Sequence, residues 1–205
     1  MRMDTPAQVI TGGSPPAVRA LGYAVAAWCL GFAGVSAWLI ADLVADPEAA
    51  ARRFAADASG LVIISLLVLV LKLAGAAVAL AAVLVSPGTA RRRVRLLGVA
   101  VWGAFGVLAL YSAGNLFISV GTESGLLAPS AAWTAAGGVT GRAVLYVLFF
   151  LAGAAMFGVL AVWFHRRHHL RWTAAVAGLA GAPLLLGLIL AAAPAILGRW
   201  DLLPT

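Results

Sequence analysis

The chain contains a single lysine, Lys72, which lies in the middle of the second long apolar run. An ammonium group at the centre of a bilayer costs about 3 kcal/mol on insertion scales, and about 10 kcal/mol or more in simulations of the related arginine. A charged residue placed at such a cost is a candidate functional group. The arginines, by contrast, lie mostly at the ends of the apolar runs or between them.

Three roles are open for Lys72. It could bind an anionic head group or substrate, or exchange a proton. It could instead be a structural hydrogen-bond donor that fixes the packing of helices. It could also pair with an acid of another subunit, because the sequence places no acidic residue at its depth and Asp42 lies nearer the membrane surface.

Three further polar residues are expected close to this lysine. At helical spacing, Ser65 shares one face of the second run with Lys72 and Gly75, so this small and polar face is expected to point into the protein. In the third run, Tyr111 lies close to Lys72 in depth, and Asn115 follows one helical turn further out. The sequence therefore predicts an intramembrane polar site made of Lys72, Ser65, Tyr111 and Asn115.

Two clusters of arginine form a second candidate site, for the phosphates of anionic lipids. They follow the second and fourth apolar runs and comprise Arg91, Arg92, Arg93, Arg95, Arg166 and Arg167. The second cluster also holds His165, His168 and His169, whose spacing could suit a metal. Since no carboxylate or cysteine is near enough to complete a ligand set, the sequence predicts no metal site and no cofactor.

The elements that must position these residues are membrane-spanning helices. Hydrophobic residues make up 63% of the 205 residues and charged residues 10%, whereas soluble domains carry about 25% charged residues. A helix needs about 20 apolar residues to cross the hydrocarbon core. The sequence predicts an all-α membrane protein, a bundle of about five transmembrane helices. The expected spans are Arg19–Val44, Ser59–Val85, Leu96–Val120, Arg142–Phe164 and Trp172–Leu197.

The connections predict an orientation. Those after the second and fourth spans are short and basic, whereas those after the first and third are longer and contain acidic residues. The positive-inside rule places the basic connections and the N-terminus in the cytoplasm and the C-terminus outside. We expect a disordered cytoplasmic tail over residues 1–18, one transmembrane domain over 19–198 and a short outer tail over 199–205. The expected location is the bacterial cytoplasmic (inner) membrane, crossed several times.

Two outer connections have features of their own. Asp46 is expected to cap a short amphipathic helix that begins with Pro47 and offers Arg52, Arg53 and Phe54 at the surface. The longest connection, 121–141, could cover the mouth of the bundle. The single cysteine, Cys29, is expected to be a buried thiol within the first span.

Two stretches of the chain resemble a group of small actinobacterial integral membrane proteins. One runs from Leu21 through Trp28 to Trp38, and the other from Phe149 to the basic cluster at Arg167. The use of arginine almost without lysine, with abundant alanine, also fits a high-GC genome. The resemblance implies a small polytopic membrane protein, and the group has no assigned activity to transfer.

The sequence contains none of the common catalytic motifs, such as HExxH or GxSxG, and no nucleotide-binding loop. Its net charge of +7 comes from arginines beside apolar runs, which points to lipid head groups and not to nucleic acid. We expect a non-enzymatic accessory or assembly subunit, or a binder of lipids or hydrophobic ligands. The expected partners are membrane lipids, anionic on the cytoplasmic side, and a further candidate partner is another membrane protein subunit. The alternative is a transporter or permease component in which Lys72 handles an anion or a proton.

Overall fold

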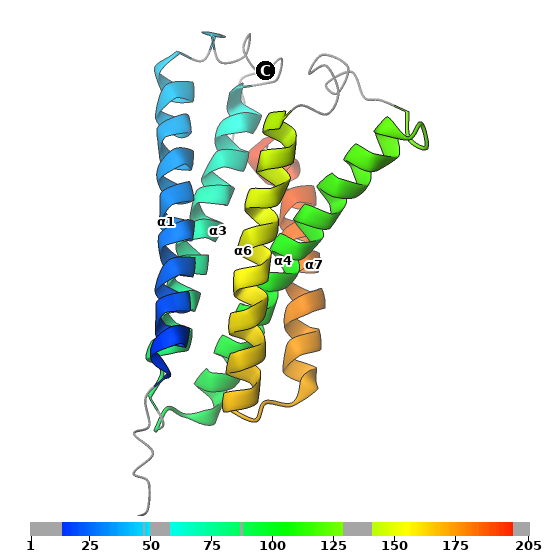
Figure 1. Cartoon of the computed structure of the whole chain (residues 1–205). Helices are drawn as coiled ribbons and strands as arrows, with labels where there is room; N and C mark the ends of the chain where they lie inside the picture. The colour runs from blue at the N-terminus through cyan, green and yellow to red at the C-terminus, as the bar shows by residue number, and fades with distance from the viewer. Residues whose placement is uncertain (1–13, 47, 50–57, 87, 129–140, 199–205) are drawn as a thin grey trace, which may run out of the picture.

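A computed structural model describes residues 14–46, 48–49, 58–86, 88–128 and 141–198 of the chain. Its five long helices, labelled in Figure 1, are each long and apolar enough to cross a membrane, and the described residues contain no strand. The prediction of five spans is confirmed, and the chain is an all-helical, multi-pass membrane protein. The helices are α1 (Pro16–Ala45), α3 (Ala58–Leu84), α4 (Arg91–Glu123), α6 (Gly141–Arg167) and α7 (Trp172–Gly198).

The helices form because hydrocarbon offers no partner for backbone N–H and C=O groups, which an α-helix satisfies internally. At the basic side, α1, α4 and α6 extend past their predicted spans, whereas α3 and α7 end within one residue of the prediction. The helix α4 begins at Arg91, so the first arginine cluster forms its opening turns and not a loop. The helix α6 likewise continues to Arg167.

The boundary of the predicted N-terminal tail is wrong, because α1 begins at Pro16, about one turn before Arg19. Ser14 is also ordered and buried: its hydroxyl donates to the Val83 carbonyl at 2.8 Å and accepts from Arg167 Nη1 at 2.9 Å. Residues 14–18 thus belong to the folded domain. The remainder of the predicted tail, 1–13, and the outer tail, 199–205, lie outside the described residues.

The bundle has two parts. The helices α1 and α3 pack along each other as a hairpin, while α4 packs against both α6 and α7 to form a trio. Contacts between the hairpin and the trio are fewer, and they come from α3 with α4 and from α6 with α1 and α3. Figure 1 shows α6 standing between the hairpin and the strongly tilted α4. We call the boundary between the two parts the seam.

Glycines set the close approach within the trio. A Cβ added to Gly178 of α7 would lie 2.5 Å from the Val99 carbonyl and 2.9 Å from the Gly103 amide, both on α4. A Cβ added to Gly106 would lie 3.0 Å from the Leu179 carbonyl. Backbones this close gain dispersion contacts that lipid chains cannot supply, which is how helices associate in a membrane.

The outer connections are described only in part. The Ala49 amide donates to Asp46 Oδ1 at 2.9 Å, the hydrogen bond expected of a helix N-cap. The surface residues predicted there, Arg52, Arg53 and Phe54, lie outside the described residues, as does most of the connection 121–141. Cys29 is buried, as predicted.

Candidate functional site

Lys72 points into the bundle. The residue is 7% exposed, and Ser65 on the same face of α3 is also buried. This confirms that the small and polar face of the second span is turned inward.

Three aromatic rings surround the ammonium group. Lys72 Nζ lies 4.3 Å from the ring centroid of Trp28, 4.5 Å from that of Phe150 and 4.7 Å from that of Phe32. These distances are well within the 6 Å over which the negative face of a ring attracts a cation. Within the described residues, Lys72 is paired with rings and not with a carboxylate. We call Trp28, Phe32 and Phe150 the ring cage.

The cage is held in place by further aromatic contacts. Trp28 stacks on Phe149 with centroids 4.8 Å apart, and Phe150 meets Phe32 edge-on at 5.2 Å. Space for the indole comes from Gly153 of α6, because a Cβ there would lie 2.6 Å from two atoms of the Trp28 ring. The rings therefore have little freedom to turn away from the lysine.

The structure places Tyr111 and Asn115 one layer further from the amine. The Tyr111 ring packs on Phe150 with centroids 4.9 Å apart, and its hydroxyl donates to the Tyr146 hydroxyl at 3.0 Å. Asn115 Nδ2 donates to the Tyr111 carbonyl at 2.8 Å, a bond within α4. Tyr111 thus adjoins the site through Phe150, while Asn115 is engaged by its own helix.

Sequence reasoning missed the ring cage, although a signal was present. The start of α1 and the end of α3 lie at the same side of an antiparallel pair. Trp28 is as far along the chain from the start of α1 as Lys72 is from the end of α3, so the two residues come to the same depth. Phe32 follows Trp28 by one helical turn, on the same face. The contribution of Phe150 was harder to predict, because no pattern in the sequence indicates which span packs on this hairpin.

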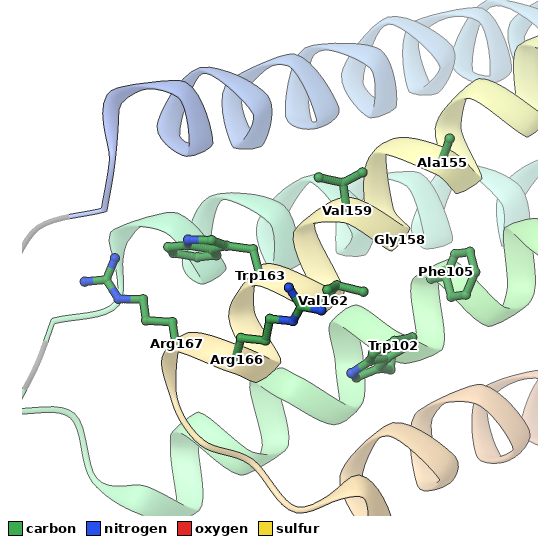
Figure 2. A pocket seen from close by; sticks show the side chains of 9 residues that line it. All are labelled: Trp102, Phe105, Ala155, Gly158, Val159, Val162, Trp163, Arg166 and Arg167. Carbon is green, nitrogen blue, oxygen red and sulfur yellow. The ribbon is translucent and has the colours of Figure 1, made fainter.

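A second feature is an open groove of about 920 Å³ between α4 and α6. Figure 2 shows Trp102 and Phe105 of α4 on one side and Val159 and Val162 of α6 on the other. Arg166, in the last turn of α6, lies at one end of this groove. The groove therefore joins a long apolar wall to a cationic end.

The cationic end holds further polar groups. Three buried ring nitrogens near this end, Trp102 Nε1, His165 Nδ1 and His168 Nε2, have no hydrogen-bond partner among the described residues, and of these residues only Trp102 lines the groove. The guanidinium of Arg167 lies 5.1 Å from the Trp163 ring centroid and extends away from Arg166 in Figure 2, and its Nη1 donates to Ser14. This end can thus offer the Trp102 indole N–H and positive charge to an anion.

The first arginine cluster reinforces the charge at the same end of the bundle. Its members, Arg91, Arg92, Arg93 and Arg95, are all exposed in the first two turns of α4. The N-terminus of a helix carries a partial positive charge, which disfavours cations there. Phosphate groups of the membrane surface would offset that repulsion.

The described residues contain no group of three or more His, Cys, Asp or Glu that could hold a metal. The histidine cluster is divided between two environments. The His165 ring packs at a tilt against Trp172, with ring centroids 4.6 Å apart, and the His168 ring against Phe164, with centroids 4.4 Å apart. Burial and the neighbouring Arg167 and His169 lower the pKa of His168 below its usual value of 6.5. Comparison of the chain with protein-family models, with curated proteins and with solved structures finds no match.

Proposed function

We propose that this protein is a non-enzymatic, lipid-binding membrane protein that holds an anionic phospholipid in the groove between α4 and α6. The observation that supports this most directly is the joining of an apolar wall to a cationic end formed by Arg166 in the last turn of α6. An acyl chain would lie along Phe105, Val159 and Val162, and the phosphate would meet the Arg166 guanidinium. A bidentate arginine–phosphate pair is among the stronger polar contacts in proteins.

The unpartnered indole nitrogen of Trp102 fits the same ligand. Ester and phosphate oxygens are hydrogen-bond acceptors, and the Trp102 indole N–H is a donor at the same end of the groove. A small side-chain shift would bring such an oxygen within reach of it. The exposed arginines of α4 would contact neighbouring head groups with less specificity.

The proposal includes an orientation. In it, the N-terminus and the connections α3–α4 and α6–α7 lie in the cytoplasm and the C-terminus lies outside, in the cytoplasmic membrane of a bacterium; the arginine clusters support this through the positive-inside rule. The bound lipid would then belong to the cytoplasmic leaflet. A role beside another membrane protein subunit, as an accessory or assembly factor, is compatible with this binding.

The alternative, a transporter component in which Lys72 handles an anion or a proton, receives less support. The three rings occupy the space around the amine that an anion or a chain of waters would need. Transport through this position would require the cage to open first.

The test is a lipid titration of the purified protein followed by native mass spectrometry. We expect phosphatidylglycerol to bind about tenfold more tightly than phosphatidylcholine of the same chain length. Both lipids carry the phosphate, but the choline ammonium of phosphatidylcholine is repelled by the Arg166 guanidinium, and a difference of about 1.4 kcal/mol is tenfold in affinity. Arg166→Gln should remove that preference, and Val159→Trp, which fills the groove, should weaken both lipids.

The matched control is Arg171→Gln, which removes an exposed arginine of the same connection that does not line the groove. It should retain the preference for phosphatidylglycerol. Equal binding of the two lipids by the unaltered protein, or an equal effect of Arg166→Gln and Arg171→Gln, would contradict the proposal.

A further inference from the structure

The ring cage crosses the seam of the bundle. Lys72 belongs to α3 and Trp28 and Phe32 to α1, so these three lie in the hairpin, whereas Phe150 belongs to α6 of the trio. The Trp28–Phe149 stack crosses the same boundary. Contacts between hairpin and trio are fewer than those within each part. The lysine therefore lies where the two parts of the molecule are least firmly joined.

We propose that Lys72 is a cation–π latch: its ammonium group, shared between rings of the hairpin and a ring of the trio, holds the seam closed at the middle of the membrane. The latch is strong because hydrocarbon surrounds it. In water an ammonium released from a ring is solvated at once, whereas here a retreat of α6 would leave it with fewer partners in a medium of low dielectric constant. Opening the seam at this level therefore costs electrostatic energy in addition to packing.

A second contact holds the seam at the basic end of the bundle. Arg167 of α6 donates to Ser14, which in turn donates to the Val83 carbonyl of α3. Further from that end, the surface between α1 and α6 is hollowed by an apolar groove of about 540 Å³ whose lining includes Trp28, Phe32 and Tyr146. Two rings of the cage, Trp28 and Phe32, thus line the hollow part of the seam, and the same two rings contact Lys72.

The native cysteine reports on this seam. Cys29 is 1% exposed and follows Trp28 in the chain. A Cβ added to Gly75 of α3 would lie 3.2 Å from its sulfur and 3.6 Å from Phe157 of α6, so the thiol lies where α1, α3 and α6 meet. A membrane-permeant maleimide can reach it only when these helices separate. Its labelling rate in proteoliposomes therefore measures how often the latch opens.

The decisive experiment replaces Phe150 with phenylalanines carrying one, two or three ring fluorines. Each fluorine withdraws electron density from the ring face with little change in volume, which weakens a cation–π contact and leaves packing almost intact. We expect the labelling rate of Cys29 to rise in steps, by about tenfold for the trifluoro ring. The same series at Phe157, which also lies against this region but is not part of the cage, should leave the rate unchanged. A flat response at Phe150, or equal responses at Phe150 and Phe157, would overturn the proposal.

Variants of the lysine give an independent readout. Lys72→Met keeps the length of the side chain without its charge and should label about tenfold faster. Lys72→Ala should also label faster and leaves space within the ring cage. Added ethylammonium should bind in this space and slow the labelling of Cys29, whereas ethanol, which is similar in size but uncharged, should not slow it. Labelling of Lys72→Met at the rate of the unaltered protein, or equal rescue by the neutral compound, would also refute the latch. These labelling rates do not depend on lipid binding between α4 and α6. A failure of the latch proposal can therefore be distinguished from a failure of the proposed lipid binding.

Discussion

A lysine at the middle of a membrane is tolerated here because its charge is distributed over three ring faces. Its Nζ lies between 4.3 Å and 4.7 Å from three ring centroids, those of Trp28, Phe32 and Phe150. A single desolvated cation–π contact contributes about 2 kcal/mol, so the cage offsets part of the cost of placing an ammonium at this depth. Among the described residues, the cage does this without a carboxylate beside the amine.

The first prediction concerns His168, which follows α6 and stacks on Phe164. Because its pKa is lowered in the folded protein, the unfolded chain binds more protons as the pH falls through about 6.5. The contribution of neutral His168 to the free energy of unfolding should be fully present above about pH 7. It should decline as the pH falls below this value, until the pH reaches the lowered pKa of the folded protein. Thermal unfolding in detergent between pH 7.5 and 5 measures this decline.

His168→Gln should flatten the decline, because the titrating group is gone. His169→Gln, which changes an exposed neighbour, should keep most of it. An unchanged pH dependence in His168→Gln would show that another group controls acid sensitivity.

The sequence predicted part of this chemistry, for physical reasons that differ between residues. The inward position of Lys72 followed from helical spacing, because a charged group and small residues shared one face of α3. Phe150 could not be assigned to the cage, since aromatic residues occur on lipid-facing surfaces as readily as inside a membrane protein. Tyr111 was expected nearest the amine because it is polar, but in the absence of water the ring faces of apolar residues serve the cation as well.

At the scale of the helices, the spans were predictable and their pairing was not. Twenty apolar residues must cross a bilayer as a helix, whatever their order. The pairing of the helices depends on local shape. The absence of a side chain at Gly178 lets α7 approach α4, and the absence of one at Gly153 leaves room on α6 for the Trp28 ring. Such local complementarity has no periodic signature in a sequence that is apolar on every face.

The second prediction tests that close contact. Gly178→Ala should destabilise the protein by about 1–3 kcal/mol, because the new methyl group would overlap backbone atoms of α4 that cannot move alone. Gly181→Ala, in the same helix, meets no atom within 4 Å and should change stability by less than about 0.5 kcal/mol. Thermal unfolding of both variants in detergent measures the difference. Equal effects would show that α4 and α7 are not held at the observed distance.

The third prediction concerns the end of α6, where His169 adopts a left-handed conformation with φ of 47°. The His169 amide donates to the Arg166 carbonyl at 3.4 Å and the Leu170 amide to the His165 carbonyl at 3.2 Å, the hydrogen bonds of a Schellman motif. Glycine adopts this conformation without steric cost, so His169→Gly should stabilise by about 0.5–1 kcal/mol. His169→Val should destabilise by about 1 kcal/mol or more. Denaturation of both variants checks whether the glycine variant is the more stable and the valine variant the less stable. The two would not rank in this way if residue 169 did not hold the left-handed conformation in solution.

At the scale of the whole molecule, charge divides the bundle into two unlike ends. The end formed by the connections α3–α4 and α6–α7 carries the arginine clusters, whereas the described carboxylates Asp42, Asp46, Glu48 and Glu123 lie toward the other end. The groove between α4 and α6 reaches Arg166 at the basic end, and the ring cage lies between the two ends. The proposed lipid site and the proposed latch would thus occupy different depths of one small bundle.

The fourth prediction follows from this asymmetry. In a Cys29→Ser background, a cysteine at Ser124 should react with an impermeant maleimide in intact cells, whereas one at Gly88 should react only in inverted vesicles. Both positions are exposed, so accessibility differs only by side of the membrane. Changing Arg91, Arg92, Arg93 and Arg95 together to glutamine should give a population of mixed orientation, because positive charge near span ends biases the insertion of membrane proteins. Changing the four arginines to lysine should preserve a single orientation. If, with the arginines unchanged, the cysteine at Gly88 reacted in intact cells and the one at Ser124 only in inverted vesicles, the proposed lipid groove would lie in the outer leaflet.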